Sequence, residues 1–187
     1  MVFKINPYDP CVANKVINGE QLTVVWHVDD LKVSHKDENV VLAFCVKMLQ
    51  LYGSGTKSSW GKVHDFLGMD LDWSRDGVFI VSMIKYLQKI IDDFPEEIRA
   101  TRATPANDNL FKIREEGEQQ LLPQEQAQAF HHSTAQLVFL AMRARPNVQP
   151  VVSFLAKRVR APDEDDWGKL KNCLKYLKGT LHISNCT

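Results

Sequence analysis

The chain has 187 residues, 44% of them hydrophobic and 25% charged, which is enough apolar material for a packed core. Its 23 Lys and Arg residues balance 23 Asp and Glu residues, which excludes a global electrostatic demand for nucleic acid or for an anionic membrane. No apolar run of about 18 residues predicts a membrane span, and the N-terminus MVFKINPYDP lacks the apolar core of a signal peptide. We therefore expect a soluble intracellular protein, in the cytoplasm or the nucleus, with no membrane partner.

The first elements are three predicted strands joined by tight turns. Residues 12–17 alternate in part, Asn18-Gly19 supplies the positive-φ residues that a hairpin turn needs, and residues 21–27 run back. Residues 31–35 alternate again, so the tripeptide Val-Asp-Asp before them connects the second strand to the third. The sequence thus predicts two consecutive hairpins.

The second connection carries two adjacent acids, Asp29 and Asp30. Neighbouring side chains in a regular strand point to opposite faces, so both acids can serve one site only where the backbone turns, as at a hairpin tip. Carboxylates held there suit Mg²⁺ or Mn²⁺, and in two-metal phosphoryl transfer, ions roughly 4 Å apart need carboxylates from more than one element. The pair would be half of such a site. The alternative is a plain polar turn, because Asp is among the commonest turn residues.

Further on, the chain alternates helices and strands. Asp37 can cap the start of a helix that Gly53 ends. The apolar segments DFLGMDLDW and VFIVS flank Ser74-Arg75-Asp76-Gly77 and predict another hairpin, and a helix that Pro95 closes follows it. Residues 1–94 therefore read β-β-β-α-β-β-α.

The remainder of the chain divides into an irregular and a helical part. Residues 95–126 change in composition and show no sustained period, which predicts an acidic linker or a long loop. Within residues 127–187 three helical patterns follow. Their apolar positions are Phe130, Thr134, Leu137 and Ala141; Val148, Val151, Val152, Leu155 and Val159; and Trp167, Leu170, Leu174 and Leu177, with Gly179 past the last end. The predicted fold class is α+β, an antiparallel sheet with two packed helices followed by a helical region.

Charge is unevenly distributed along the chain. Residues 92–130 hold nine acids against four bases, whereas residues 141–180 hold nine bases against four acids. In the last predicted helix Lys169, Lys171, Lys175 and Lys178 lie mostly off the apolar stripe, which would suit contacts with nucleic-acid phosphates. The alternative is that these lysines solvate an exposed helix face.

The acid pair in its context resembles a known motif. An apolar strand, His27 at a usually aromatic position, Val, Asp-Asp and a second strand resemble the aromatic-x-Asp-Asp catalytic hairpin of reverse transcriptases. Further blocks resemble, in the same order, those of Ty1/copia-type retrotransposon polyproteins over nearly the whole chain. These blocks are DPCVANKVINGEQLTVVWHVDD, FLGMDLDWSRDGVFIVSMIKYLQKII, TPAND, LVFLAMRARPNVQPVVSFLAKRVRAP and LKYLKGT.

This resemblance implies a fold and an activity. Residues 1–94 would be a partial reverse-transcriptase palm, 95–126 a linker or long loop, and 127–187 the helical region that precedes an RNase H domain. The activity would be RNA-directed DNA polymerisation on an RNA/DNA template–primer. Asp29 would be the main catalytic metal ligand and Asp30 the supporting acid, with Mg²⁺ or Mn²⁺ as cofactor. His27 departs from the aromatic pattern, so it would either contact primer or template or be a semi-exposed strand histidine.

The resemblance also implies missing parts. The second metal-binding aspartate and the nucleotide-binding residues of the family lie upstream of such a hairpin, and the RNase H acids lie downstream of LKYLKGT. We therefore expect a polyprotein fragment that carries half of a two-metal site and is inactive alone, with the upstream fingers and palm and the downstream RNase H part as partners. The competing hypothesis is a non-catalytic, degenerate or domesticated nucleic-acid-binding module.

Overall fold

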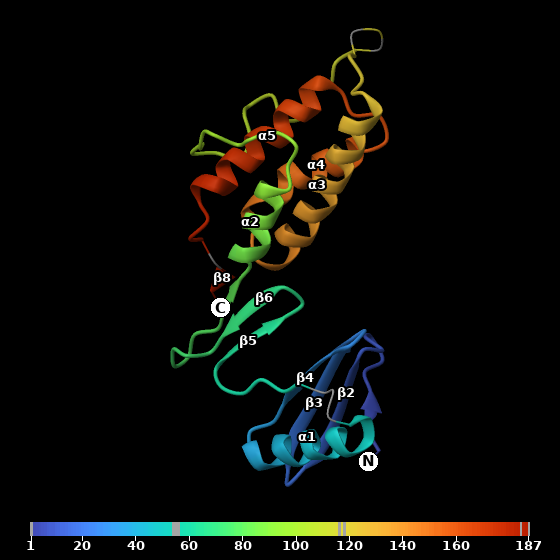
Figure 1. The fold of residues 1–187 in the computed structure, drawn as a ribbon, viewed down its shortest axis with the longest axis vertical. Helices are drawn as coiled ribbons and strands as arrows, with labels where there is room; N and C mark the ends of the chain where they lie inside the picture. The colour runs from blue at the N-terminus through green and yellow to red at the C-terminus, as the bar shows by residue number, and fades with distance from the viewer. Residues whose placement is uncertain (1, 54–56, 116, 118, 184, 187) are drawn as a thin grey trace. The chain divides into compact units, whose positions relative to one another are not determined.

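The computed structural model describes residues 2–53, 57–115, 117, 119–183 and 185–186. The chain forms two compact units, Met1–Leu67 and Gly68–Thr187 (Figure 1). Both units contain antiparallel strands, and the described residues include five α-helices, so the fold is mixed α and β. None of the helices in these described ranges is long and apolar enough to cross a bilayer.

The first unit contains a four-stranded antiparallel sheet in the order β1-β2-β3-β4. The strands are β1 (Lys4–Ile5), β2 (Val12–Ile17), β3 (Glu20–His27) and β4 (Asp30–Ser34). Asn18 and Gly19, with φ of 52° and 81°, form the two-residue turn between β2 and β3, as predicted. The predicted strands β2, β3 and β4 are confirmed within one residue, whereas β1 is too short for a sequence pattern to reveal it.

One helix, α1 (Glu38–Tyr52), packs on one face of this sheet (Figure 1). Its start and end agree with the prediction, because the Asp37 side chain accepts the Asn39 N–H and Gly53 ends the helix with φ of 80°. Leu22 and Val24 of β3 and Phe44 of α1 form the buried core of the unit. Alternate residues of β3 thus face the helix, and the others line the opposite face of the sheet.

The boundary between the two units coincides with a tight turn. Strand β5 (Val63–Phe66) precedes Leu67 and Gly68, which have φ of 55° and 72°. These positive values turn the chain inside DFLGMDLDW, which was predicted to be a single strand. The prediction was wrong on this point because a lone glycine between apolar residues gives only a weak turn signal.

The second unit combines a small antiparallel sheet with four α-helices. Its elements are β6 (Met69–Asp72), β7 (Ile80–Ser82), α2 (Ile84–Asp92), α3 (Gln124–Arg143), η1 (Pro146–Val148), α4 (Gln149–Arg158), α5 (Glu164–Gly179) and β8 (Asn185–Cys186). Asp72 pairs with Ile80 across the β6–β7 connection, which confirms the hairpin predicted around Ser74–Gly77. The helices bury one continuous apolar core, in which Leu137, Leu155 and Leu174 are fully enclosed.

Helix α5 has a well-defined start and a slightly later end than predicted. Asp163 and Asp166 form a capping box, in which each side chain accepts the backbone N–H of the other residue. Gly179 is the last helical residue rather than the first residue beyond the helix, and Thr180 forms the C-cap.

The irregular segment between α2 and α3 belongs to the core of the second unit. Ile98, Leu110 and Leu122 are 2%, 6% and 8% exposed and lie in the same apolar cluster as the helices. Residues 120–122 also pair with the start of α5, where Leu122 N–H donates to Pro162 O over 3.0 Å. The predicted division of the chain into residues 1–94, 95–126 and 127–187 was based on composition and resemblance, not on compactness. That division remains a prediction.

A buried arginine connects the loop after α3 to the end of α5. Arg145 is 2% exposed, and its two terminal nitrogens donate to Thr180 O over 2.9 Å and to Thr180 Oγ1 over 2.7 Å. Its Nε donates to Asn147 Oδ1 over 3.1 Å. Burial lowers the pKa of Arg145, although its ordinary value is so high that the guanidinium keeps its charge. The acceptors that satisfy this buried cation are neutral oxygens.

Candidate functional site

The acid pair lies at the tip of the β3–β4 hairpin, as the sequence predicts. His27 pairs with Asp30 as the last rung of the ladder, so Val28 and Asp29 form a two-residue turn. Asp29 lies in the turn itself, and Asp30 is the first residue of β4. Val28 has φ of 52°, a left-handed conformation that a β-branched residue rarely adopts.

Both carboxylates at the tip are open to solvent and uncommitted. Asp29, Asp30 and His27 are all exposed. Within the described part of the chain, neither carboxylate accepts a hydrogen bond or forms an ion pair. Two hard oxygen donors at a hairpin tip are the kind of group that Mg²⁺ or Mn²⁺ binds together with water and phosphate oxygens.

The register decides which side chains share a face of the hairpin. Directly opposite residues in an antiparallel pair point to the same face, so His27 and Asp30 lie on one side of the sheet. Lys32 lies on that side too, two residues along β4, where its ammonium group donates to Ser34 Oγ over 3.2 Å. Burial lowers the pKa of Lys32. The tip therefore combines an imidazole and two carboxylates, while the Lys32 ammonium group contacts Ser34, further along β4.

The acid pair alone does not complete a metal site. Among residues that the structure describes, no group of three or more His, Cys, Asp or Glu side chains could hold a metal ion. The hairpin offers at most two carboxylate ligands, and a divalent cation bound there would take its other ligands from water, substrate or additional protein.

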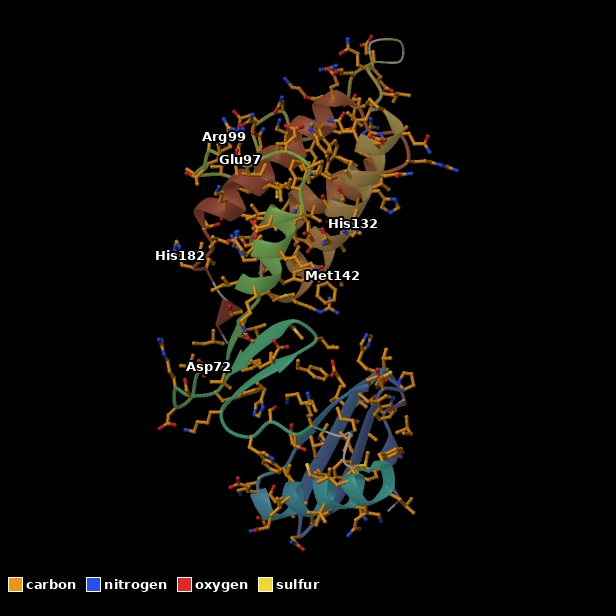
Figure 2. The ribbon with its side chains drawn as sticks, in the orientation of Figure 1. Asp72, Glu97, Arg99, His132, Met142 and His182 are labelled. Carbon is orange, nitrogen blue, oxygen red and sulfur yellow. The ribbon has the colours of Figure 1, made fainter. Side chains whose placement is uncertain are left out.

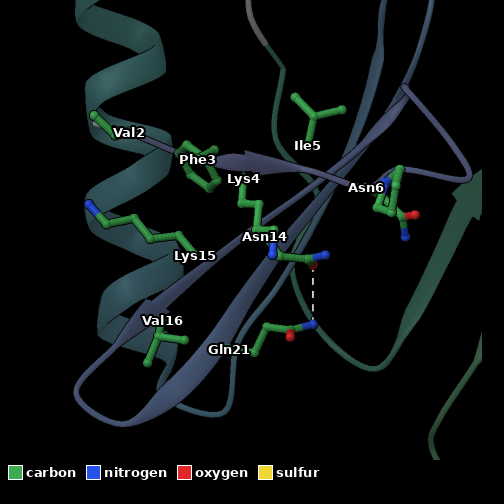
Figure 3. Close-up of a pocket in the computed structure, with 10 residues that line it drawn as sticks. Val2, Phe3, Lys4, Ile5, Asn6, Asn14, Lys15, Val16 and Gln21 are labelled. Atoms are coloured by element: carbon green, nitrogen blue, oxygen red, sulfur yellow. Dashed lines mark hydrogen bonds between the residues drawn. The ribbon is translucent and has the colours of Figure 1, made fainter.

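A surface hollow of about 540 Å³ lies elsewhere in the first unit (Figure 3). Lys4, Asn14 and Gln21 contribute to its lining, and Gln21 Nε2 donates to Asn14 Oδ1 over 3.1 Å. Its lining residues come from β1 and the residues beside it, from β2 and from the start of β3, and include neither acid of the hairpin tip. The hollow is therefore a feature separate from the acid pair.

The predicted lysine row of α5 faces the protein itself at several points. Lys169, expected mostly off the apolar stripe, is only 6% exposed. Its Nζ lies 2.7 Å from Asp165 Oδ2, donates to Lys112 O over 2.6 Å and lies 4.8 Å from the centre of the Phe154 ring. Such a buried ammonium group serves the packing of the unit, and a phosphate would have to displace these partners.

The other three lysines of α5 lie beside the irregular segment. Lys171 Nζ is 2.5 Å from Glu96 Oε2, and Lys178 Nζ donates to Ile98 O. The carbonyl group of Lys175 accepts the Arg102 N–H over 3.3 Å. Contacts of these lysines with nucleic acid remain a prediction. Phosphates of a nucleic acid would have to displace the internal partners of Lys171 and Lys178.

Glu96 is a charged partner that sequence reasoning missed. Its carboxylate accepts hydrogen bonds from Lys171 Nζ and, over 2.6 Å, from Trp167 Nε1. The hydrogen bond from Lys171, followed by that from Trp167, lowers the pKa of Glu96. No sequence signal could have revealed this pair, because Glu96 lies in an aperiodic segment 75 residues before its lysine.

Comparisons with known proteins agree with the resemblance at a coarse level. Over 95% of its length the chain is 23% identical to a retrovirus-related Pol polyprotein from transposon TNT 1-94 of Nicotiana tabacum. Over 84% it is 25% identical to an uncharacterized mitochondrial protein of Arabidopsis thaliana and 24% identical to a transposon Ty5-1 protein of Saccharomyces cerevisiae.

The chain spans 14%, 62% and 49% of the lengths of these three relatives, respectively. No protein-family model matches the chain, and no solved structure matches it. Two of these relatives are named as transposon products, so the chain is similar to a region of retrotransposon polyproteins.

Proposed function

We propose that the chain is a fragment of an RNA-directed DNA polymerase, a reverse transcriptase of the Ty1/copia type. In this proposal the first unit and the beginning of the second correspond to part of the palm, and the helices after them to the region before RNase H. The observation that carries the proposal is the hairpin tip, where Asp29 and Asp30 are exposed and have no partner among the described residues. Similarity to a Pol polyprotein along 95% of the chain supports it.

The chemistry proposed for the tip is phosphoryl transfer to a primer. The primer 3′-hydroxyl would attack the α-phosphate of a deoxynucleoside triphosphate and release pyrophosphate, and divalent cations held by Asp29 and Asp30 would stabilise the charge that develops on the attacking and leaving oxygens. As the resemblance to the aromatic-x-Asp-Asp motif implies, Asp29 would be the main ligand and Asp30 the supporting one. Mg²⁺ fits this donor set, and Mn²⁺ fits it as well.

The remaining ligands would come from other parts of a longer polyprotein and from the template–primer. Strand β4 pairs with β3 alone among the described strands, so its second edge is open to a further strand. A strand added at that edge would bring its side chains next to Asp30, where an additional carboxylate could complete the site. The fragment alone is proposed to be inactive.

Paramagnetic broadening by Mn²⁺ tests the metal site directly. Backbone NMR signals of residues 27–30 are expected to broaden at Mn²⁺ concentrations that leave the rest of the chain unaffected. Asp29→Asn should abolish this selectivity, whereas Asp108→Asn, which also neutralises an exposed acid, should not. Equal broadening in wild type and Asp29→Asn would remove the basis of the proposal.

A primer-extension assay tests the second half of the proposal. With Mg²⁺, a template–primer and deoxynucleoside triphosphates, the chain alone is expected to synthesise no more DNA than Asp29→Asn. Robust synthesis that depends on Asp29 would show that the chain is a competent enzyme by itself and would refute the idea of a half-site.

The alternative proposal is a non-catalytic nucleic-acid-binding module. The excess of bases between residues 141 and 180 favours it. It predicts binding that weakens with salt, needs no divalent cation and survives Asp29→Asn. Loss of binding in Asp29→Asn would contradict it.

A further inference from the structure

The irregular segment 96–102 lies along the half of α5 that carries Lys171, Lys175 and Lys178. The ammonium group of Lys171 donates a hydrogen bond to Glu96, and that of Lys178 donates one to the carbonyl oxygen of Ile98. We propose that residues 96–102 form a strap that competes with the phosphates of nucleic acid for these two lysines. The strap would keep Lys171 and Lys178 from binding phosphates until a nucleic acid displaces it.

The competition follows from the chemistry of the ammonium group. A lysine ammonium group has three N–H donors and no preferred planar geometry, so carboxylate, carbonyl and phosphate oxygens are interchangeable partners. The side chains of Lys171 and Glu96 are 31% and 42% exposed, and ion pairs in such surroundings are weak. Several phosphates acting together can therefore replace a single carboxylate.

Burial separates the lysines that can exchange partners from the one that cannot. Lys169 is enclosed and holds Asp165 and the Lys112 carbonyl group, so it is a structural residue. Lys171 and Lys178 are only half-buried. The masked surface is thus the C-terminal half of α5, beyond Lys169.

The strap is held to α5 by hydrogen bonds and by one buried side chain. Glu96 accepts bonds from Lys171 and Trp167, Ile98 O accepts one from Lys178, and the Arg102 N–H donates to Lys175 O. Phe94 stacks on Trp167 at 4.9 Å just before it, and Ile98 is 2% exposed within it. Residues 99–101 are exposed. Near its end Thr101 lies close to Gly179, where an added Cβ would be 3.0 Å from Thr101 Cβ. A segment with one buried anchor is a good candidate for local opening.

Two charge-neutralising variants provide a matched test. Glu96→Gln removes the carboxylate that binds Lys171, whereas Glu97→Gln removes a neighbouring acid that is 70% exposed and pairs with Arg99 (Figure 2). Both variants change the net charge equally, so general electrostatic attraction cancels in the comparison. The measurement is the Kd for a fluorescent homopolymeric thymidine oligonucleotide, by anisotropy, at low salt and without divalent cations.

Glu96→Gln is expected to tighten oligonucleotide binding about two- to fivefold, the range for a partly exposed ion pair, with a smaller change for Glu97→Gln. Equal changes would overturn the strap, because they would show that only net charge matters. The inference rests on the nucleic-acid part of the proposed function and not on its metal site. Absence of oligonucleotide binding in all three proteins would overturn the strap while leaving the Mn²⁺ test of the hairpin intact.

Hydrogen exchange at Arg102 reports the strap itself. Its backbone N–H donates to Lys175 O, so the Arg102 amide should exchange faster when the oligonucleotide displaces the strap. Unchanged or slower exchange on binding would overturn the proposal. Inorganic phosphate, added at the same total phosphate concentration, is the control for a free anion. If it accelerates exchange of the Arg102 amide as much as the oligonucleotide does, competition specific to nucleic acid is overturned.

Discussion

Replacing Val28 by glycine should stabilise the β3–β4 hairpin. Val28 has φ of 52°, and an L-residue in the left-handed region is disfavoured by about 1–2 kcal/mol, whereas glycine is not. Glycine in turn loses about 0.5–1 kcal/mol through the greater freedom of the unfolded chain. The Val28 side chain is 84% exposed, so its removal sacrifices little buried surface. The balance is a gain of about 0.5–1 kcal/mol.

The same substitution in a regular strand provides the control. Val16 lies in β2, is 69% exposed and has no positive φ, so Val16→Gly should destabilise the sheet by a similar amount. Hydrogen exchange of β3 and β4 amides measures both effects. Val28→Gly should slow exchange about two- to fivefold and Val16→Gly should accelerate it. If both variants accelerate exchange alike, the strain attributed to the turn does not exist.

Two further predictions concern α5 and the segment beside it. Gly168→Ala should stabilise the second unit by up to about 1 kcal/mol, since Gly168 is helical with open space for a Cβ. Gly179→Ala should destabilise the unit, because the added Cβ would press against Thr101. Urea denaturation measures both effects, and similar midpoints for the two variants would contradict the prediction. The hydrogen bond from Lys171 lowers the pKa of Glu96 in the folded protein below its ordinary value of 4.5. The ionised Glu96 carboxylate therefore contributes its full stabilisation above pH 4.5, and this stabilisation is lost as the pH falls through the lowered folded-state pKa. Exchange protection of the Arg102 amide should therefore decrease below pH 4.5 in wild type but not in Glu96→Gln, and identical profiles would refute the role of this carboxylate.

Local chemistry made parts of the fold predictable from the sequence. Asn18-Gly19 specifies a two-residue hairpin turn, Asp37 a helix cap and Gly53 a helix end, and each acts through its own backbone or its nearest neighbours. The turn at Val28 was predictable only from the alternation of the strands around it. Nothing in the residue type predicts that this valine adopts positive φ, because strand register rather than residue preference places it in the turn.

Long-range packing was not predictable in this way. The segment around Ile98 has no period, yet it lies in the core of the second unit. Lys169 belongs to a helical pattern whose polar face is readily assigned, yet its burial depends on Lys112, 57 residues earlier. For the candidate site, the position of Asp29 and Asp30 at a hairpin tip is confirmed, and their metal-binding role stays a prediction.

The buried Arg145 sets a practical limit on how the second unit can be shortened. Both of its terminal nitrogens depend on oxygens of Thr180, 35 positions later in the chain. A version ending before Thr180 would leave an enclosed cation without these acceptors, a situation that costs several kcal/mol in proteins. Protein engineers who want the helical unit in isolation should therefore place its C-terminal boundary beyond residue 180, even though the last fully buried leucine among the described residues is Leu177.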